Sequence, residues 1–101
     1  MKVKNVNKTG ENFPSPTCKC INWLDHWRKN KKIKPTRCRC CNKSFDTEDL
    51  VGAHIKKDNS TDNGLYIIPL CHECNHPSNT TAFDVPEADL VSANCANCVN
   101  K

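Results

Sequence analysis

The chain has 101 residues, enough for one domain, and only 37% of them are hydrophobic even with nine cysteines counted. The formal charge of +4 counts all nine cysteines as neutral thiols, so it gives no argument for a nucleic-acid partner if most of them are thiolates. Without a secretory signal pattern or an apolar run near the ~20 residues that span a bilayer, we expect a cytoplasmic, non-membrane protein whose reduced thiols bind metal and staple a thin core.

The N-terminal part of the chain is polar and is followed by a short amphipathic stretch. We expect residues 1–17 to form a flexible arm and residues 18–101 to form a single domain. Residues 21–30 carry apolar side chains at helical spacing and therefore predict a short helix. The two tryptophans of this helix are predicted core residues, with a stacking surface for bases as the alternative, and His26 is expected to pack beside them.

Positive charge is concentrated directly after this helix. Residues 1–57 hold 14 lysines and arginines against 5 acidic residues, whereas residues 58–101 hold 1 against 6. Seven of the cations fall within residues 28–39, a stretch that could contact the phosphates of DNA or RNA or could be a solvated loop. The candidate contacts are Arg28, Lys29, Lys31, Lys32, Lys34, Arg37 and Arg39.

The second half of the chain predicts a hairpin between two cysteine-containing turns. Residues 38–46 are typical of a zinc knuckle. Two β-like runs follow at residues 51–55 and 65–70, and an Asn-Gly turn signal between them predicts that they pair. Residues 72–79 could start a helix, and residues 86–92 could form at most a short one.

The cysteines fall into close pairs, and a two-residue gap lets two thiolates reach one tetrahedral zinc ion at about 2.3 Å. We expect the pairs to nest into two structural zinc sites, with the outer site joining the two ends of the domain. The inner site uses Cys38, Cys41, Cys71 and Cys74. The outer site uses Cys18, Cys20, Cys95 and Cys98. Cys40 is then not used as a ligand, although it could replace Cys38 or Cys41. His72 or His76 could also replace a thiolate. A disulfide could join the outer cysteines instead of a metal ion.

Residues 36–80 resemble a known family, the zinc-containing HNH endonucleases. The motif is C-x-x-C at 38–41, a hairpin whose first strand carries His54, and C-x-x-C at 71–74 followed at once by Asn75. It is most similar to phage junction-resolving members, in which asparagine follows the last zinc cysteine. The flanks are similar to a bacterial and phage group with the same order of motifs, which implies no function.

The resemblance implies a small, metal-stabilised α+β fold of the HNH-like ββα-metal (treble-clef) type. It implies that His54 is the general base that activates water for attack on a phosphodiester. It also implies that Asn75 binds a catalytic Mg²⁺ or Mn²⁺ ion and that Asn63 braces the loop. The residues alone leave other roles open, because His54 could be a packing histidine and Asn75 a turn residue.

One position departs from the family pattern. Ala53 stands where most members have an acidic residue or a histidine that binds the catalytic metal. The candidate replacements are Asp58, Asp62, Glu73 and His76. The sequence therefore predicts a zinc-stabilised, HNH-like nucleic-acid-binding protein with endonuclease activity in question; the alternative is a non-catalytic zinc module that binds nucleic acid or a protein partner.

Overall fold

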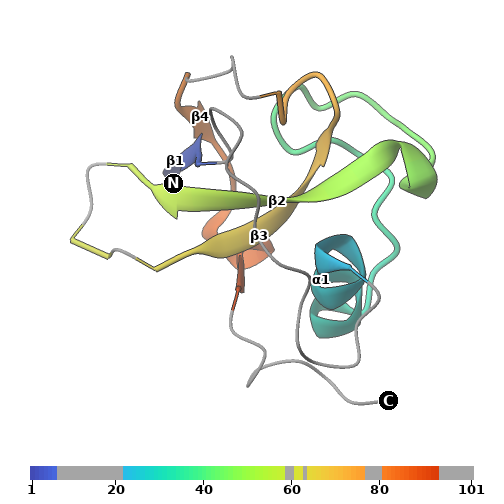
Figure 1. The fold of residues 1–101 in the computed structure, drawn as a ribbon, viewed down its shortest axis with the longest axis horizontal. Helices are drawn as coiled ribbons and strands as arrows, with labels where there is room; N and C mark the ends of the chain where they lie inside the picture. The colour runs from blue at the N-terminus through green and yellow to red at the C-terminus, as the bar shows by residue number, and fades with distance from the viewer. Residues whose placement is uncertain (7–21, 59–60, 63, 77–80, 94–101) are drawn as a thin grey trace.

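The first well-defined element after the N-terminal strand is a single helix. The computed structural model describes residues 1–6, 22–58, 61–62, 64–76 and 81–93 (Figure 1). Helix α1 spans Trp23–Lys31, close to the predicted range of 21–30. The side chain of Asn22 caps it by accepting a hydrogen bond from the backbone N–H of Asp25 at 2.8 Å. The helix ends where Lys32 adopts the left-handed conformation with φ 57°.

The described strands form one antiparallel sheet in the order β4-β1-β2-β3-β5. Its centre is the pair β2 (Leu50–Lys57) and β3 (Tyr66–Cys71), in which His54 lies opposite Ile67. The predicted hairpin of the two β-like runs is thus confirmed. The outer strands are β1 (Lys2–Asn5), β4 (Phe83–Asp84) and β5 (Val91–Ser92).

Strand β1 corrects part of the prediction for the N-terminus. Residues 2–5 pair with β2 on one side and β4 on the other, rather than belonging to a flexible arm. The side chains of Val3 and Asn5 are buried while those of the two lysines are exposed, so the strand completes the sheet and adds to its core. Residues 7–17 of the predicted arm lie outside the described residues.

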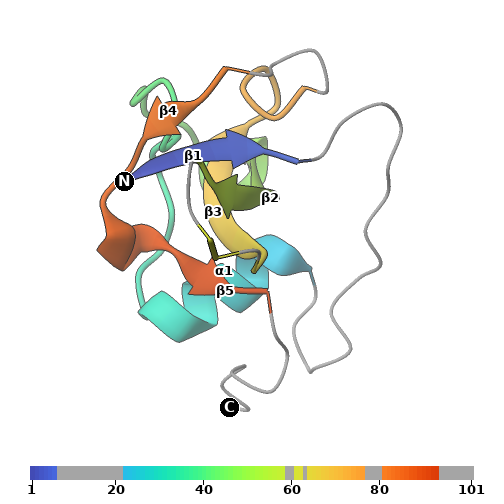
Figure 2. The same ribbon diagram turned by 90° about the vertical axis from the view of Figure 1, so that its left-hand side faces the viewer.

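Helix α1 packs against β2, β3 and β5, at one end of the sheet (Figure 2). A Cβ atom on Gly52 would lie 2.4 Å from the backbone nitrogen of Leu24, so a glycine is needed where the helix crosses β2. Trp27 is 1% exposed and packs with Ile67 and Val91. This confirms the core position predicted for that tryptophan.

The chain after β3 differs from the predicted helices. Residues 72–76 form turns where the start of a helix was expected, and residues 77–80 are not described. Within residues 86–92 the structure has the 3-10 turn Glu87–Asp89 (η2) followed by β5. The small α+β class with one antiparallel sheet is confirmed, whereas the ββα-metal assignment, which requires a helix after the second cysteine pair, stays a prediction.

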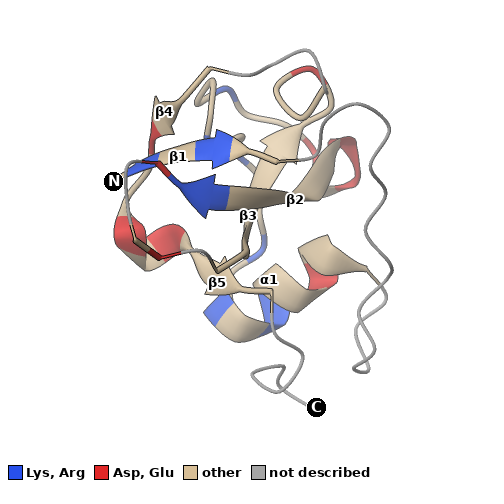
Figure 3. Ribbon diagram, turned by 60° about the vertical axis from the view of Figure 1, so that its left-hand side comes forward, with Lys and Arg blue, Asp and Glu red and all other residues tan. Residues whose placement is uncertain are grey.

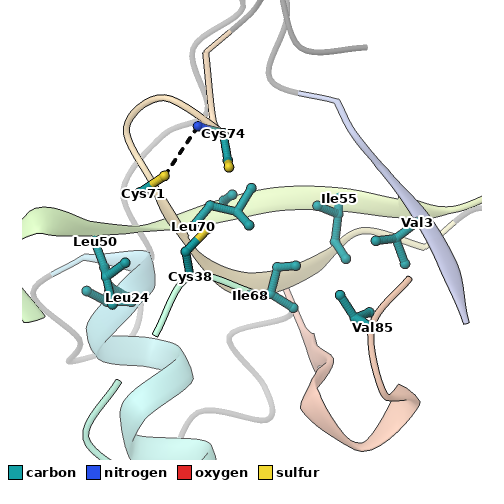
Figure 4. Packing of buried hydrophobic residues seen from close by; sticks show 11 residues of the cluster. Val3, Leu24, Cys38, Leu50, Ile55, Ile68, Leu70, Cys71, Cys74 and Val85 are labelled. Carbon is teal, nitrogen blue, oxygen red and sulfur yellow. Dashed lines mark hydrogen bonds between the residues drawn. The ribbon is translucent and has the colours of Figure 1, made fainter. Parts of the chain in front are cut away.

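The larger apolar cluster of the core reaches from β1 to the cysteines. Figure 4 shows Val3, Val85 and Ile55 at one end of the cluster, with Leu70 between the two ends. The sulfur atoms of the cysteines gather at the other end, beside Leu70. The cysteine group is therefore continuous with the hydrophobic core.

Candidate metal centre

Four cysteine sulfurs converge at one point of the fold. The Sγ atoms of Cys38, Cys41, Cys71 and Cys74 all lie within 4.8 Å of one another. Sulfurs held at about 2.3 Å from a tetrahedral ion are separated by about 3.8 Å, so a small adjustment would let the group hold a metal ion such as zinc. The first two sulfurs come from the turn before β2; Cys71 is the last residue of β3, and Cys74 lies in the turn that follows.

The two cysteine turns have similar backbone hydrogen bonds. In the first turn, the N–H of Asn42 donates to the carbonyl oxygen of Cys38 at 2.9 Å; in the second, the N–H of Asn75 donates to that of Cys71 at 3.0 Å. The N–H of Cys41 also donates to the sulfur of Cys38, and the N–H of Cys74 donates to that of Cys71, at 3.5 Å in both turns. Each turn thus presents two thiols in one direction and stabilises negative charge on sulfur.

The titration of these thiols fits a site that needs a cation. Burial raises the pKa of Cys38, but backbone amides of Cys41, Cys71 and Cys40 outweigh this and lower the pKa to about 7. Burial raises the pKa of Cys71 and of Cys74. Four thiolates at this separation repel one another, and a divalent ion supplies the positive charge that keeps all four deprotonated.

The structure brings one of the alternative ligand sets of this inner site together. Among the described residues, the four-cysteine group is the only cluster of three or more potential metal ligands. Cys40 is half-buried against the core and lies outside it, and His72 and His76 are exposed and also outside it. The predicted outer site, formed by Cys18, Cys20, Cys95 and Cys98, lies outside the described residues, as does Asn63.

His54 lies on β2 beneath the helix and is only 5% exposed. Its imidazole meets the ring of Trp23 edge-on, with ring centroids 5.0 Å apart, and Trp23 meets His26 in the same way at 5.1 Å. Burial lowers the pKa of His54 to about 4. The imidazole is therefore neutral at pH 7, as a general base must be, but it is enclosed between helix and sheet.

Asn75 lies on the other face of the sheet. Its side-chain oxygen accepts a hydrogen bond from the amide of Asn5 at 3.2 Å, and Asn5 lies directly opposite Ile55 on β2. Paired residues of antiparallel strands share a face, and successive residues of one strand alternate between faces. Ile55 and Asn5 therefore point away from the face of His54. The structure does not bring His54 and Asn75 together.

Asn5 is a site residue that the sequence analysis missed. It lies 70 positions before its partner, in a polar N-terminal segment where no local pattern marks it. Its bond uses one of the two lone pairs of the oxygen with which Asn75 would bind a catalytic ion. The equivalence of Asn75 and Asn42 in the two cysteine turns agrees with the alternative role of Asn75 as a turn residue.

The predicted replacements for the missing ligand are dispersed. Ala53 itself is 1% exposed within the sheet. The carboxylate of Asp62 accepts a hydrogen bond from the hydroxyl of Tyr66 at 2.5 Å and forms an ion pair with Lys57 at 3.2 Å. Glu73 is exposed in the second cysteine turn. Within the described ranges, no set of three ligand-bearing side chains surrounds His54.

Several of the predicted phosphate contacts are engaged within the protein. Arg28 and Lys29 both form ion pairs with the buried carboxylate of Asp25. Arg39 forms an ion pair with Asp89 at 2.9 Å, and its guanidinium lies over the indole ring of Trp27. These three cations contribute to the packing of α1 and its neighbours, and two carboxylates, Asp25 and Asp89, offset part of their charge.

The remaining cations of residues 28–39 form no ion pair with a carboxylate of the described residues. Lys31 and Arg37 donate to backbone carbonyl oxygens, Arg37 at 2.7 Å. Lys32 and Lys34 are exposed, and neither has a carboxylate partner in the described part of the chain. The exposed candidates without a carboxylate partner in the described residues thus lie in the short loop after α1.

Compared with known proteins, the chain matches no family model, no curated protein and no solved structure. None of the helices in the described residues has the length and apolar character needed to cross a membrane.

Proposed function

We propose that this chain is a zinc-stabilised, non-catalytic module that binds DNA or RNA. The observation that carries the zinc part of the proposal is the convergence of four cysteine sulfurs within 4.8 Å. A closed set of four thiolates has no open coordination position and is typical of structural zinc rather than catalytic zinc. A second structural zinc at the outer cysteines belongs to the same proposal.

The nucleic-acid part of the proposal is supported by the exposed cations beside the first cysteine turn. Lys32, Lys34 and Arg37 extend from the end of α1 to Cys38, the first zinc ligand. Metal binding would fix one end of this loop, and the helix fixes the other. Cations held in this way contact phosphate at a smaller entropic cost than cations on a flexible tail.

Binding is tested by fluorescence anisotropy with labelled single-stranded and duplex DNA and RNA over a series of salt concentrations. We expect affinity to fall steeply with salt, because each phosphate contact releases counterions. The variant Lys32→Gln/Lys34→Gln should bind more weakly. For a duplex, the slope of log affinity against log salt concentration should become shallower by about two units. Absence of binding at low salt to any of these probes would refute the proposal.

A second candidate is HNH-type phosphodiester cleavage with Mg²⁺ or Mn²⁺, favoured by the neutral imidazole of His54. The enclosure of that imidazole and its position across the sheet from Asn75 favour the binding module instead. Incubation of plasmid DNA with the protein and either ion separates the two. We expect no nicking; nicking that His54→Gln abolishes in a folded protein would establish the nuclease.

A further inference from the structure

Two lysines lie directly opposite each other on neighbouring strands. The register of β1 and β2 pairs Lys4 with Lys56, and both side chains are exposed. Side chains paired in this way have Cβ atoms about 5 Å apart, and like charges at this position destabilise a sheet. Packing gives no reason for the arrangement, because neither side chain is buried.

Lys2 adds a third charge to the same face. It lies two residues before Lys4 on β1, about 7 Å along the strand, and therefore points in the same direction. Two carboxylates border the group: Asp84 lies 3.4 Å from Lys2, and Asp58 lies 3.9 Å from Lys4. No carboxylate of the described residues lies within ion-pair distance of Lys56. Figure 3 shows the basic segments of β1 and β2 side by side.

Among the described residues, no helix packs on this part of the sheet. Lys56 lies two residues beyond His54 on β2 and so shares its face, which is the face that α1 covers further along. The helix packs against β2, β3 and β5, whereas the lysines lie where β1 joins β2 (Figure 2). Lys2, Lys4 and Lys56 therefore form an exposed basic patch, the β1–β2 patch, on a rigid sheet.

We infer that the β1–β2 patch binds the phosphodiester backbone of a nucleic acid. This inference rests on the proposed function and adds a contact surface outside residues 28–39. One phosphodiester group has two non-bridging oxygens, so the ammonium groups of Lys4 and Lys56 can each donate a hydrogen bond to a different oxygen of the same phosphate. The bound anion would remove the repulsion between the lysines. Lys2 is placed to meet the next phosphate along a strand.

The observations favour nucleic acid over an anionic membrane as the partner. Electrostatic membrane recognition typically uses clusters of four to eight basic residues or an added apolar anchor. The β1–β2 patch has three lysines bordered by two carboxylates. A nucleic-acid backbone requires only one cation for each phosphate that it places on the surface.

The test is the charge reversal Lys56→Glu, with Lys43→Glu as the matched control. Lys43 is also exposed and also lacks a carboxylate partner among the described residues, but it lies in the first cysteine turn. Lys56→Glu places a carboxylate opposite Lys4, so the melting temperature should rise or stay the same. Its affinity for a labelled duplex should nevertheless fall about tenfold or more, and the salt slope should decrease by about one unit or more.

The outcomes separate this inference from the proposed function. If the wild type binds nucleic acid and Lys56→Glu weakens binding no more than Lys43→Glu does, the β1–β2 patch is not a contact surface. The proposed nucleic-acid-binding function is then unaffected. If the wild type binds no nucleic acid, both fail. If it instead binds vesicles of phosphatidylserine and phosphatidylcholine in a Lys56-dependent way, the patch is a membrane contact and the inference is overturned.

Discussion

At the scale of single residues, the buried imidazole of His54 makes stability depend on pH. Its pKa falls from 6.5 to about 4 on folding, because burial disfavours the charged ring. The unfolded chain therefore binds this proton more readily than the folded protein does. The free energy of unfolding should fall as pH drops below 6.5, by about 1 kcal/mol between about pH 7.5 and about pH 5.5.

The variant His54→Gln isolates this effect from the titration of the zinc ligands. Both proteins keep the same cysteines, so acid-driven loss of metal contributes equally to both. Urea unfolding at the two pH values should show a smaller pH dependence for the variant. An equal pH dependence in both proteins would mean that His54 is solvated and charged in the folded state, which would contradict its packing against Trp23.

At the scale of elements, two neighbouring cysteines in one turn should behave differently. Cys41 belongs to the four-sulfur group, whereas Cys40 does not. We expect Cys41→Ser to lose the zinc of this site and to be destabilised by several kcal/mol, on the order of the metal's contribution to folding. Cys40→Ser should retain the metal and lose about 1 kcal/mol or less. Elemental analysis and thermal melting measure the two effects.

This pair of variants is its own control, because the same chemical change is made at adjacent positions. If Cys40→Ser loses the metal and Cys41→Ser keeps it, the turn uses the other of its two spacings, C-x-C with Cys40 in place of Cys41. If both variants keep the metal, the four-sulfur group is not the zinc site. Each result can be measured on the intact protein by elemental analysis and thermal melting, without an activity assay.

The elements that could be predicted from the sequence are those defined by local patterns. Helical spacing predicts α1, and alternating apolar runs around an Asn-Gly turn predict the β2–β3 hairpin. The strands β1, β4 and β5 are two to four residues long, and their pairing depends on partners distant in the chain. Segments this short carry too little periodicity to be distinguished from loops.

The same limit applies to the candidate site. The inner cysteine set could be predicted because C-x-x-C spacing is itself the geometry of a zinc turn. The relation between His54 and Asn75 could not, because it depends on strand register, and adjacent residues of a strand point to opposite faces. The pairing of Lys4 with Lys56 is likewise invisible until β1 is placed against β2.

At the scale of the whole molecule, the cysteine group acts as an extension of the core. The apolar cluster that begins at Val3 and Val85 ends at Cys38, Cys71 and Cys74, so a metal ion held by the cysteines would be continuous with the hydrophobic interior. A domain of about 100 residues that buries few large side chains has a small margin of stability. A metal ion bound by these cysteines would therefore hold the sheet and the first cysteine turn together.

Removal of zinc should unfold the protein. Structural zinc contributes roughly 10–16 kcal/mol of apparent binding free energy in small zinc domains, as much as or more than the ~5–15 kcal/mol that stabilises a typical domain. Excess EDTA should abolish the far-UV circular dichroism of the sheet and helix. It should also shift the tryptophan emission to longer wavelength, because Trp27 is 1% exposed in the folded protein.

EDTA already saturated with zinc is the matched control, since it tests the chelator without removing metal. The protein should keep its spectrum and its melting temperature there, and zinc added back to the chelated sample should restore both. A chelated protein that keeps its melting temperature would mean that the hydrophobic cluster is sufficient on its own. The four sulfurs would then be ordinary free thiols, and the loop after α1 would lose the fixed end on which its proposed phosphate contacts depend.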